Sequence, residues 1–144
     1  LDQRTTELAQ YALGEVIRRY PDTDYARDAY LKLDLTRDNL AGKEMDIGRF
    51  YQNRGDYVAA ASRFRNVIER YGRTSHVPEA LHRITETFLL LGVPNEAQNA
   101  AAVLGYNYPD SSWYKYSYRI LRQRDLEPVK DETSWISRAI STVF

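Results

Sequence analysis

A turn that occurs three times is the feature that most restricts what this chain can fold into. The segment YPDTDY at residues 20–25 reappears as YPDSSW at 108–113, and a weaker copy, YGRTS, starts at residue 71. Proline ends a helix because it lacks an amide hydrogen, and an Asp, Ser or Thr after it can cap the next helix. Nine and thirteen residues after each tyrosine stand a small residue and an aliphatic residue: Ala29, Ala80 and Ser117, then Leu33, Ile84 and Leu121.

Amphipathic segments occupy the stretches between these turns. Their apolar residues recur at intervals of three and four, which is typical of helices with one buried face. Gly55 is expected to end one of these helices in the left-handed conformation. No stretch alternates with a period of two for long enough to be a strand, so the predicted fold class is all-α. On this spacing, helices are expected up to residue 20 and at about 24–40, 43–54, 56–71, 76–91, 95–106, 111–123 and 133–142.

Residues 41–74 match the tetratricopeptide pattern, a 34-residue helix pair with small and aromatic residues at set places. Gly48 and Ala60 stand where the two helices must approach closely, and Tyr51 and Phe64 stand where large side chains fill the space between them. A second match begins 37 residues later, with its pattern residues at Ala80, Ile84, Phe88, Gly92, Ala97 and Pro109.

The chain is therefore predicted to be a tetratricopeptide-type helix-pair solenoid. Residues 1–109 would hold a partial repeat, an insert helix and two full repeats, and residues 110–144 would form capping helices. Trp113, Trp135 and Phe144 are expected either to pack as a terminal cap or to form an extra partner surface. Tyr108 is assigned to the core, whereas the roles of Tyr114, Tyr116 and Tyr118 stay open.

Composition narrows the classes of function. The 20 acidic and 20 basic residues balance, whereas a nucleic-acid-binding domain is expected to carry a basic excess. The chain has no cysteine, so it can form neither a disulfide nor a thiolate metal site. No apolar stretch approaches the length of a membrane span. Stacked repeats create a groove suited to binding proteins or peptides, so no catalytic, cofactor-binding or metal-binding residue is expected.

The two histidines are the residues most open to a metal-site interpretation. His76 and His82 stand six residues apart, which places them on different faces of a helix, so shared ligation is not expected. His82 is expected instead to line the groove. The acidic residues are assigned to helix charges and caps, because no nucleophile motif accompanies them.

A run of more specific segments goes beyond the repeat pattern. They are YPDTDY at 20–25, Asp28-Ala29, DNLAGKE at 38–44, FYQNRGDY at 50–57, Ala59-Ala60, Arg63 and EAL at 79–81. These segments resemble the BamD family, lipoprotein subunits of the bacterial outer-membrane β-barrel assembly machinery. The element at 40–44 distinguishes that family from generic tetratricopeptide proteins and is expected to interrupt the repeat rhythm. The resemblance covers about residues 1–105, the C-terminal half of a family member.

The resemblance implies a non-catalytic scaffold on the periplasmic face of the outer membrane, anchored by a lipidated cysteine upstream of Leu1. It also implies docking onto a POTRA domain of the barrel subunit BamA, with other machinery subunits and unfolded outer-membrane proteins as further partners. Arg63 matches the family's arginine in that interface, where a guanidinium can pair with a carboxylate. The other residues expected to bind the partner are Arg49, Phe50, Tyr51 and Arg54.

Less specific interpretations of the sequence remain beside the resemblance to the BamD family. Arg63 can equally be a solvated helix charge paired with a neighbour, which would contribute little to stability. The chain as a whole could be a periplasmic tetratricopeptide adaptor of another envelope complex, such as a cell-division coordinator. It could also be a repeat module attached to a cell-wall hydrolase. The residues before Leu1 would separate these alternatives.

Overall fold

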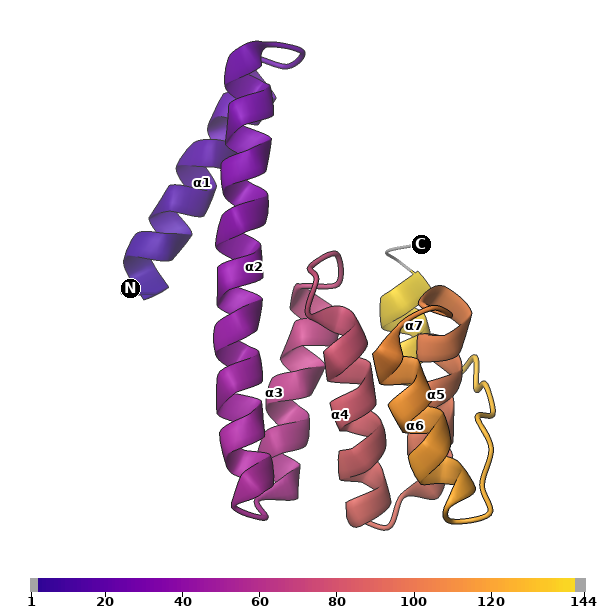
Figure 1. The fold of residues 1–144 in the computed structure, drawn as a ribbon. Helices are drawn as coiled ribbons and strands as arrows, with labels where there is room; N and C mark the ends of the chain where they lie inside the picture. Colours follow the sequence, from indigo (N-terminus) through magenta and orange to yellow (C-terminus); the bar gives the residue numbers. More distant parts are fainter. Residues whose placement is uncertain (1–2, 142–144) are drawn as a thin grey trace. The chain divides into compact units, whose positions relative to one another are not determined.

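A computed structural model describes residues 3–141, which form seven helices and contain no strand (Figure 1). The predicted all-α class is thereby confirmed, and Phe144 lies outside the described residues. No helix in this part of the chain combines the length and apolar character that crossing a bilayer requires. The helices are α1 (Gln3–Arg19), α2 (Asp24–Asn53), α3 (Tyr57–Arg70), α4 (Val77–Leu90), α5 (Pro94–Asn107), α6 (Ser112–Arg122) and α7 (Trp135–Ser141).

The chain divides into two compact units, and the first, Leu1–Leu40, is a helix pair. Its helix α1 and the first part of α2 are joined by the YPDT turn. The hydroxyl of Thr23 accepts a hydrogen bond from the Ala26 amide at 3.2 Å. This bond caps α2, as the turn pattern predicted. Most of the apolar side chains of this unit are exposed, including Leu8, Tyr11, Tyr25, Leu31 and Leu35.

Helix α2 corrects the expected helix boundaries. The separate helices expected at 24–40 and 43–54 are one continuous helix of 30 residues, and the element at 40–44 does not interrupt it. The physical reason is composition, because Leu, Ala, Lys and Glu favour helices and no proline intervenes. Gly42 is tolerated there, and its missing Cβ leaves room for the His76 ring, which would lie 3.3 Å from such an atom.

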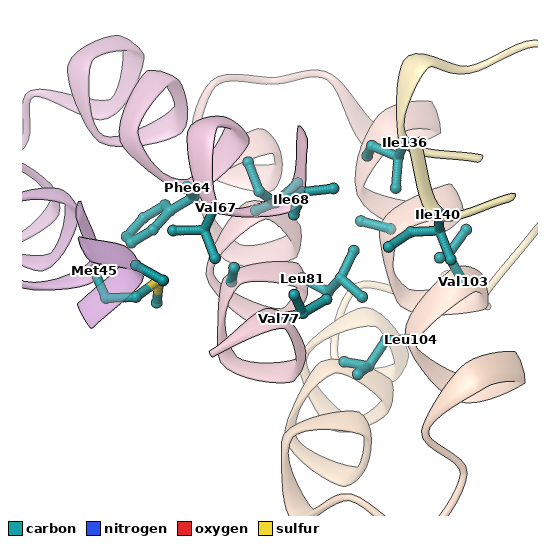
Figure 2. Close-up of a cluster of buried hydrophobic side chains, with 14 of the residues drawn as sticks. Met45, Phe64, Val67, Ile68, Val77, Leu81, Val103, Leu104, Ile136 and Ile140 are labelled. Atoms are coloured by element: carbon teal, nitrogen blue, oxygen red, sulfur yellow. The ribbon is translucent and has the colours of Figure 1, made fainter. Parts of the chain in front are cut away.

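The second unit, Ala41–Phe144, holds the hydrophobic core. Helix α4 packs against α3, α5 and α6, while α7 packs against both α3 and α5. Buried side chains of α2, α3, α4, α5 and α7 form one cluster, which includes Met45, Phe64, Leu81 and Ile136 (Figure 2). The predicted close approach is confirmed at Gly48, where an added Cβ would lie 2.4 Å from the Phe64 ring.

The turns of the second unit follow the chemistry of their residues. Gly55 and Gly92 both adopt left-handed conformations, with φ of 82° and 78°. A side chain would be strained at such an angle. The hydroxyl of Ser111 accepts a hydrogen bond from the Trp113 amide at 3.2 Å and so caps α6. The YPDSSW copy of the recurring turn therefore works like the YPDTDY copy, with a hydroxyl beyond the proline starting the next helix.

A strap of residues 123–134 leads from α6 back along α5 to α7. The Val129 amide donates to the Gln98 carbonyl at 3.2 Å, and the Asp131 amide donates to the Asn99 side-chain oxygen at 2.7 Å. Helix α7 then places Ile136 and Ile140 in the core cluster (Figure 2). Trp113 and Trp135 both pack against that cluster.

Candidate protein-docking site

Arg63 lies on α3, one residue before the buried Phe64, so its side chain leaves the helix at the edge of the core. Its Nη1 lies 3.4 and 3.5 Å from the two carboxylate oxygens of Glu44 on α2, and its side chain is 37% exposed. The Asn66 amide reaches the same carboxylate at 3.4 Å. The neighbour pair expected in the less specific interpretation is thus present. No described residue binds Nη2 or Nε of Arg63, so these donors can face a second carboxylate.

Phe50, Tyr51 and Arg54 are brought together at the end of α2. The Phe50 ring is 55% exposed and meets the half-buried Tyr51 ring edge-on at 5.8 Å between centroids. The Arg54 guanidinium lies over the Phe50 ring, 5.4 Å from its centre. The result is an exposed aromatic side chain that contacts a half-buried tyrosine ring on one edge and is flanked by a cation.

Arg49 points to a different side of α2, toward α4. Its Nη1 lies 2.7 Å from Glu79 Oε2 on α4, and its Nη2 pairs with Asp46. Burial acts to lower the pKa of Arg49, but the hydrogen bonds and charges of Glu79 and Asp46 raise it above its ordinary value. The structure therefore separates Arg49 from the Phe50–Arg54 pair.

Arg49 begins a polar network that sequence reasoning missed. Glu79 also accepts from Arg83 at 3.3 Å, and Arg83 lies 3.2 Å from Glu86. Gln52 of α2 donates to Glu86 at 3.2 Å. Burial acts to raise the pKa of Glu86, but the bond from His82, that from Gln52 and the charge of Arg83 together lower it. Glu86 and Gln52 are 34 residues apart, and neither helix periodicity nor the 37-residue offset of the repeats pairs them.

The expectation that His82 lines a groove is wrong. Its residue is only 5% exposed, because the rings of Trp113 and Tyr116 on α6 cover it. Its Nδ1 lies 2.8 Å from the hydroxyl of Ser117, and its Nε2 lies 3.5 Å from Glu86. Ser117 stands at the small position that follows the YPDSSW turn, and its hydroxyl gives the histidine a buried partner.

The row of Ser117, His82 and Glu86 has the residue types of a nucleophilic triad. A substrate, however, cannot reach the serine, as a triad requires. Ser117 is fully buried, so its hydroxyl cannot reach a carbonyl group of a bound substrate. Among the described residues, no group of histidine and carboxylate side chains is arranged to hold a metal ion. The row therefore joins α4 to α6 as part of the packing.

Comparison with known proteins identifies the group to which these helices belong. Residues 1–104 match the family model described as YfiO, outer membrane lipoprotein. The chain belongs to this family. Helices α6 and α7 lie beyond the part of the chain that the YfiO family model matches.

Curated relatives of this YfiO family member carry the name "outer membrane protein assembly factor BamD". That of Caulobacter vibrioides is 52% identical over 127 residues, which is 88% of this chain and 42% of the relative. That of Rickettsia prowazekii is 48% identical over 84% of this chain and 48% of the relative. A third, from Neisseria meningitidis, is 33% identical over 82% of this chain and 44% of the relative. The chain thus spans about half the length of these relatives.

Proposed function

We propose that this chain is part of a non-catalytic scaffold for outer-membrane protein assembly. It would dock onto a POTRA domain of BamA at the periplasmic face of the outer membrane, held there by a lipid anchor upstream of Leu1. Other subunits of the machinery and unfolded substrate would be further partners. The name shared by the relatives, assembly factor BamD, supports the assembly role.

The exposed Phe50–Arg54 pair is the observation that carries the choice of docking surface. Large aromatic residues and arginines dominate the binding energy of protein interfaces, and exposed ones are normally dispersed on a soluble surface. Here the Phe50 ring is held in place by Tyr51 and covered on one side by Arg54. An aromatic side chain that is already ordered loses little conformational entropy when a partner covers it.

Arg63 would supply a charged contact on the neighbouring helix. Its pairing with Glu44 orders the guanidinium, and the distances of 3.4 and 3.5 Å leave that pairing weak enough to be shared. A carboxylate of the partner could then bind Nη2 and Nε. Arg49 has a different role in this proposal, because Glu79 and Asp46 already bind it and it holds α2 against α4.

The test is the affinity of the protein for purified BamA POTRA domains, measured by isothermal titration calorimetry. Arg63→Glu places a negative charge beside Glu44 and is expected to weaken binding at least about tenfold. Phe50→Ala is expected to weaken it by a similar factor. Arg138→Glu on α7 makes the same change of charge at an exposed residue outside this surface and should leave the affinity unchanged.

Two results would contradict the proposal in different ways. If Arg63→Glu and Phe50→Ala bind as tightly as the unaltered protein, the docking surface lies elsewhere. If the unaltered protein binds no POTRA domain, the partner itself is wrong. Circular dichroism of both variants would show whether the helices are retained.

A further inference from the structure

Helix α6 presents an outer face that its packing against α4 and α5 leaves uncovered. Its inner side buries Ser117 and Leu121. Tyr114 lies at the border, with its ring so close to Gly105 of α5 that an added Cβ there would lie 2.4 Å away. Tyr118 continues the row outward, 44% exposed and edge-on to Tyr114 at 6.3 Å.

The two tyrosine rings form the apolar floor of an open hollow of about 680 Å³. Its remaining lining is polar and mostly basic: Lys115, Arg119, Arg122 and Gln123. Lys115, Arg119 and Arg122 recur at four and three residues, so they form a row beside the tyrosines over roughly 10 Å of helix. An apolar strip and a basic strip thus run side by side along α6.

The charge of this face is one-sided, although the whole chain is neutral. Helix α6 contains three basic residues and no acidic one. Arg122 already binds the carboxylate of Glu127 at 3.0 Å, which shows that a carboxylate can approach this row. In the described part of the chain, neither Lys115 nor Arg119 has an acidic partner.

We propose that this face of α6 is a second docking site, which binds an acidic amphipathic helix of a partner protein. Leucine-like side chains of that helix would enter the hollow over Tyr114 and Tyr118. Its carboxylates, spaced three and four residues apart, would pair with Lys115 and Arg119. The site lies beyond residue 104, outside the part that the family model matches.

Charge and shape together favour a helix over an anionic membrane surface. Tyrosine and basic residues also suit a membrane interface. A membrane-binding face, however, gains most from a broad apolar surface, whereas here the apolar floor is two rings wide and sits in a hollow. Glu127 at the end of the basic row would also be repelled by anionic lipids.

The test begins with a displayed library of 16-residue peptides that is selected on the unaltered protein. The selected peptides are expected to carry acidic residues three or four apart, beside a row of aliphatic residues. A synthetic peptide of the selected sequence should bind the K115A/R119A variant at least about fivefold more weakly, as the loss of two exposed ion pairs implies. Tyr118→Ala should weaken binding by a similar factor.

The matched control is Arg73→Glu in the turn between α3 and α4, which changes the net charge by the same amount and should leave the peptide affinity unchanged. If Arg73→Glu weakens binding as much as K115A/R119A does, the effect is general charge attraction and the proposed site is wrong. Selected peptides without acidic residues would also overturn it. Binding to vesicles that contain phosphatidylglycerol tests the alternative of a lipid surface. If the K115A/R119A variant no longer binds the vesicles but binds the peptide as tightly as the unaltered protein, the face binds lipid and the proposal is wrong. Lys115 and Arg119 are exposed, so the variant should melt like the unaltered protein.

Discussion

The two units of the chain contain the same kind of amphipathic helix, but they bury their apolar side chains to very different extents. In the first unit, the fully buried apolar residues among those described are Ala26 and Ala29. Leu31 and Leu35 of the same unit are 66% and 65% exposed. The second unit buries Phe64, Leu81 and nine other large apolar side chains in one cluster, and Leu89 and Leu121 in a second.

The difference shows that two amphipathic helices alone do not bury enough apolar surface to form a hydrophobic core. Two helices share one line of contact, so part of each apolar stripe remains in water. In the second unit, α4 has α3, α5 and α6 as neighbours, and α7 packs against both α3 and α5. Burial of apolar surface is what stabilises a fold, so the second unit should carry most of the stability.

Removing a large side chain from each unit should give the largest contrast. Phe64 is fully buried, whereas Leu35 lies in the exposed part of α2. Phe64→Ala is expected to lower the free energy of unfolding by about 3–5 kcal/mol. Leu35→Ala should change it by no more than about 0.5 kcal/mol, as is usual for a surface substitution. Urea denaturation followed by circular dichroism measures both, and similar losses would show that the first unit is as tightly packed as the second.

Adding one methyl group at two helical glycines should give a smaller contrast of opposite sign. Gly48→Ala brings a Cβ to within 2.4 Å of the buried Phe64 ring. Overpacking there should destabilise the second unit by about 1–3 kcal/mol. Gly14 of α1 has no heavy atom within 4 Å of the added position. There, the better helix propensity of alanine should stabilise α1 by up to about 1 kcal/mol. Amide hydrogen exchange would resolve the two effects by unit, and a stabilising Gly48→Ala would contradict the close approach.

The smallest expected effect is a dependence of stability on pH. The pKa of Glu86 is lower in the folded chain than its ordinary value of 4.5, so its ionised form stabilises the second unit. That contribution is complete above pH 4.5 and is lost as the pH falls through the lowered value. Glu86→Gln should therefore be less stable than the unaltered protein at pH 7 and nearly equal to it at pH 3. Urea denaturation at the two pH values measures this difference, and a gap that persists at pH 3 would contradict the prediction.

Much of the fold could be predicted because its signals are local. Proline, glycine and hydroxyl residues mark the turns, and the predicted ends of α3 to α7 lie close to those of the structure. The prediction of two helices in place of α2 is wrong, because the residues of the element at 40–44 favour a helix. The helix continues because no residue at 40–44 stops it. The repeat pattern does not predict this continuity.

The candidate site could be predicted only in part. The sequence placed Phe50, Tyr51 and Arg54 within about one turn of helix, and the structure keeps them together. The partner of Arg49 is Glu79, thirty residues away on α4, and no local rule connects them. His82 was misjudged for the same reason, since the rings that cover it belong to α6. The roles of Arg63 and its neighbours in docking stay predictions.

The position of α7 has a consequence for how the protein is made. Ile136 and Ile140 complete a core whose other members lie between Ala41 and Leu104 (Figure 2). A ribosome adds residues toward the C-terminus, so α3, α4 and α5 emerge before α7 does. Until α7 emerges, the apolar side chains of α3 and α5 that pack against it are exposed to solvent. The nascent chain thus passes through a stage in which chaperones can bind it, and docking of α7 ends that stage.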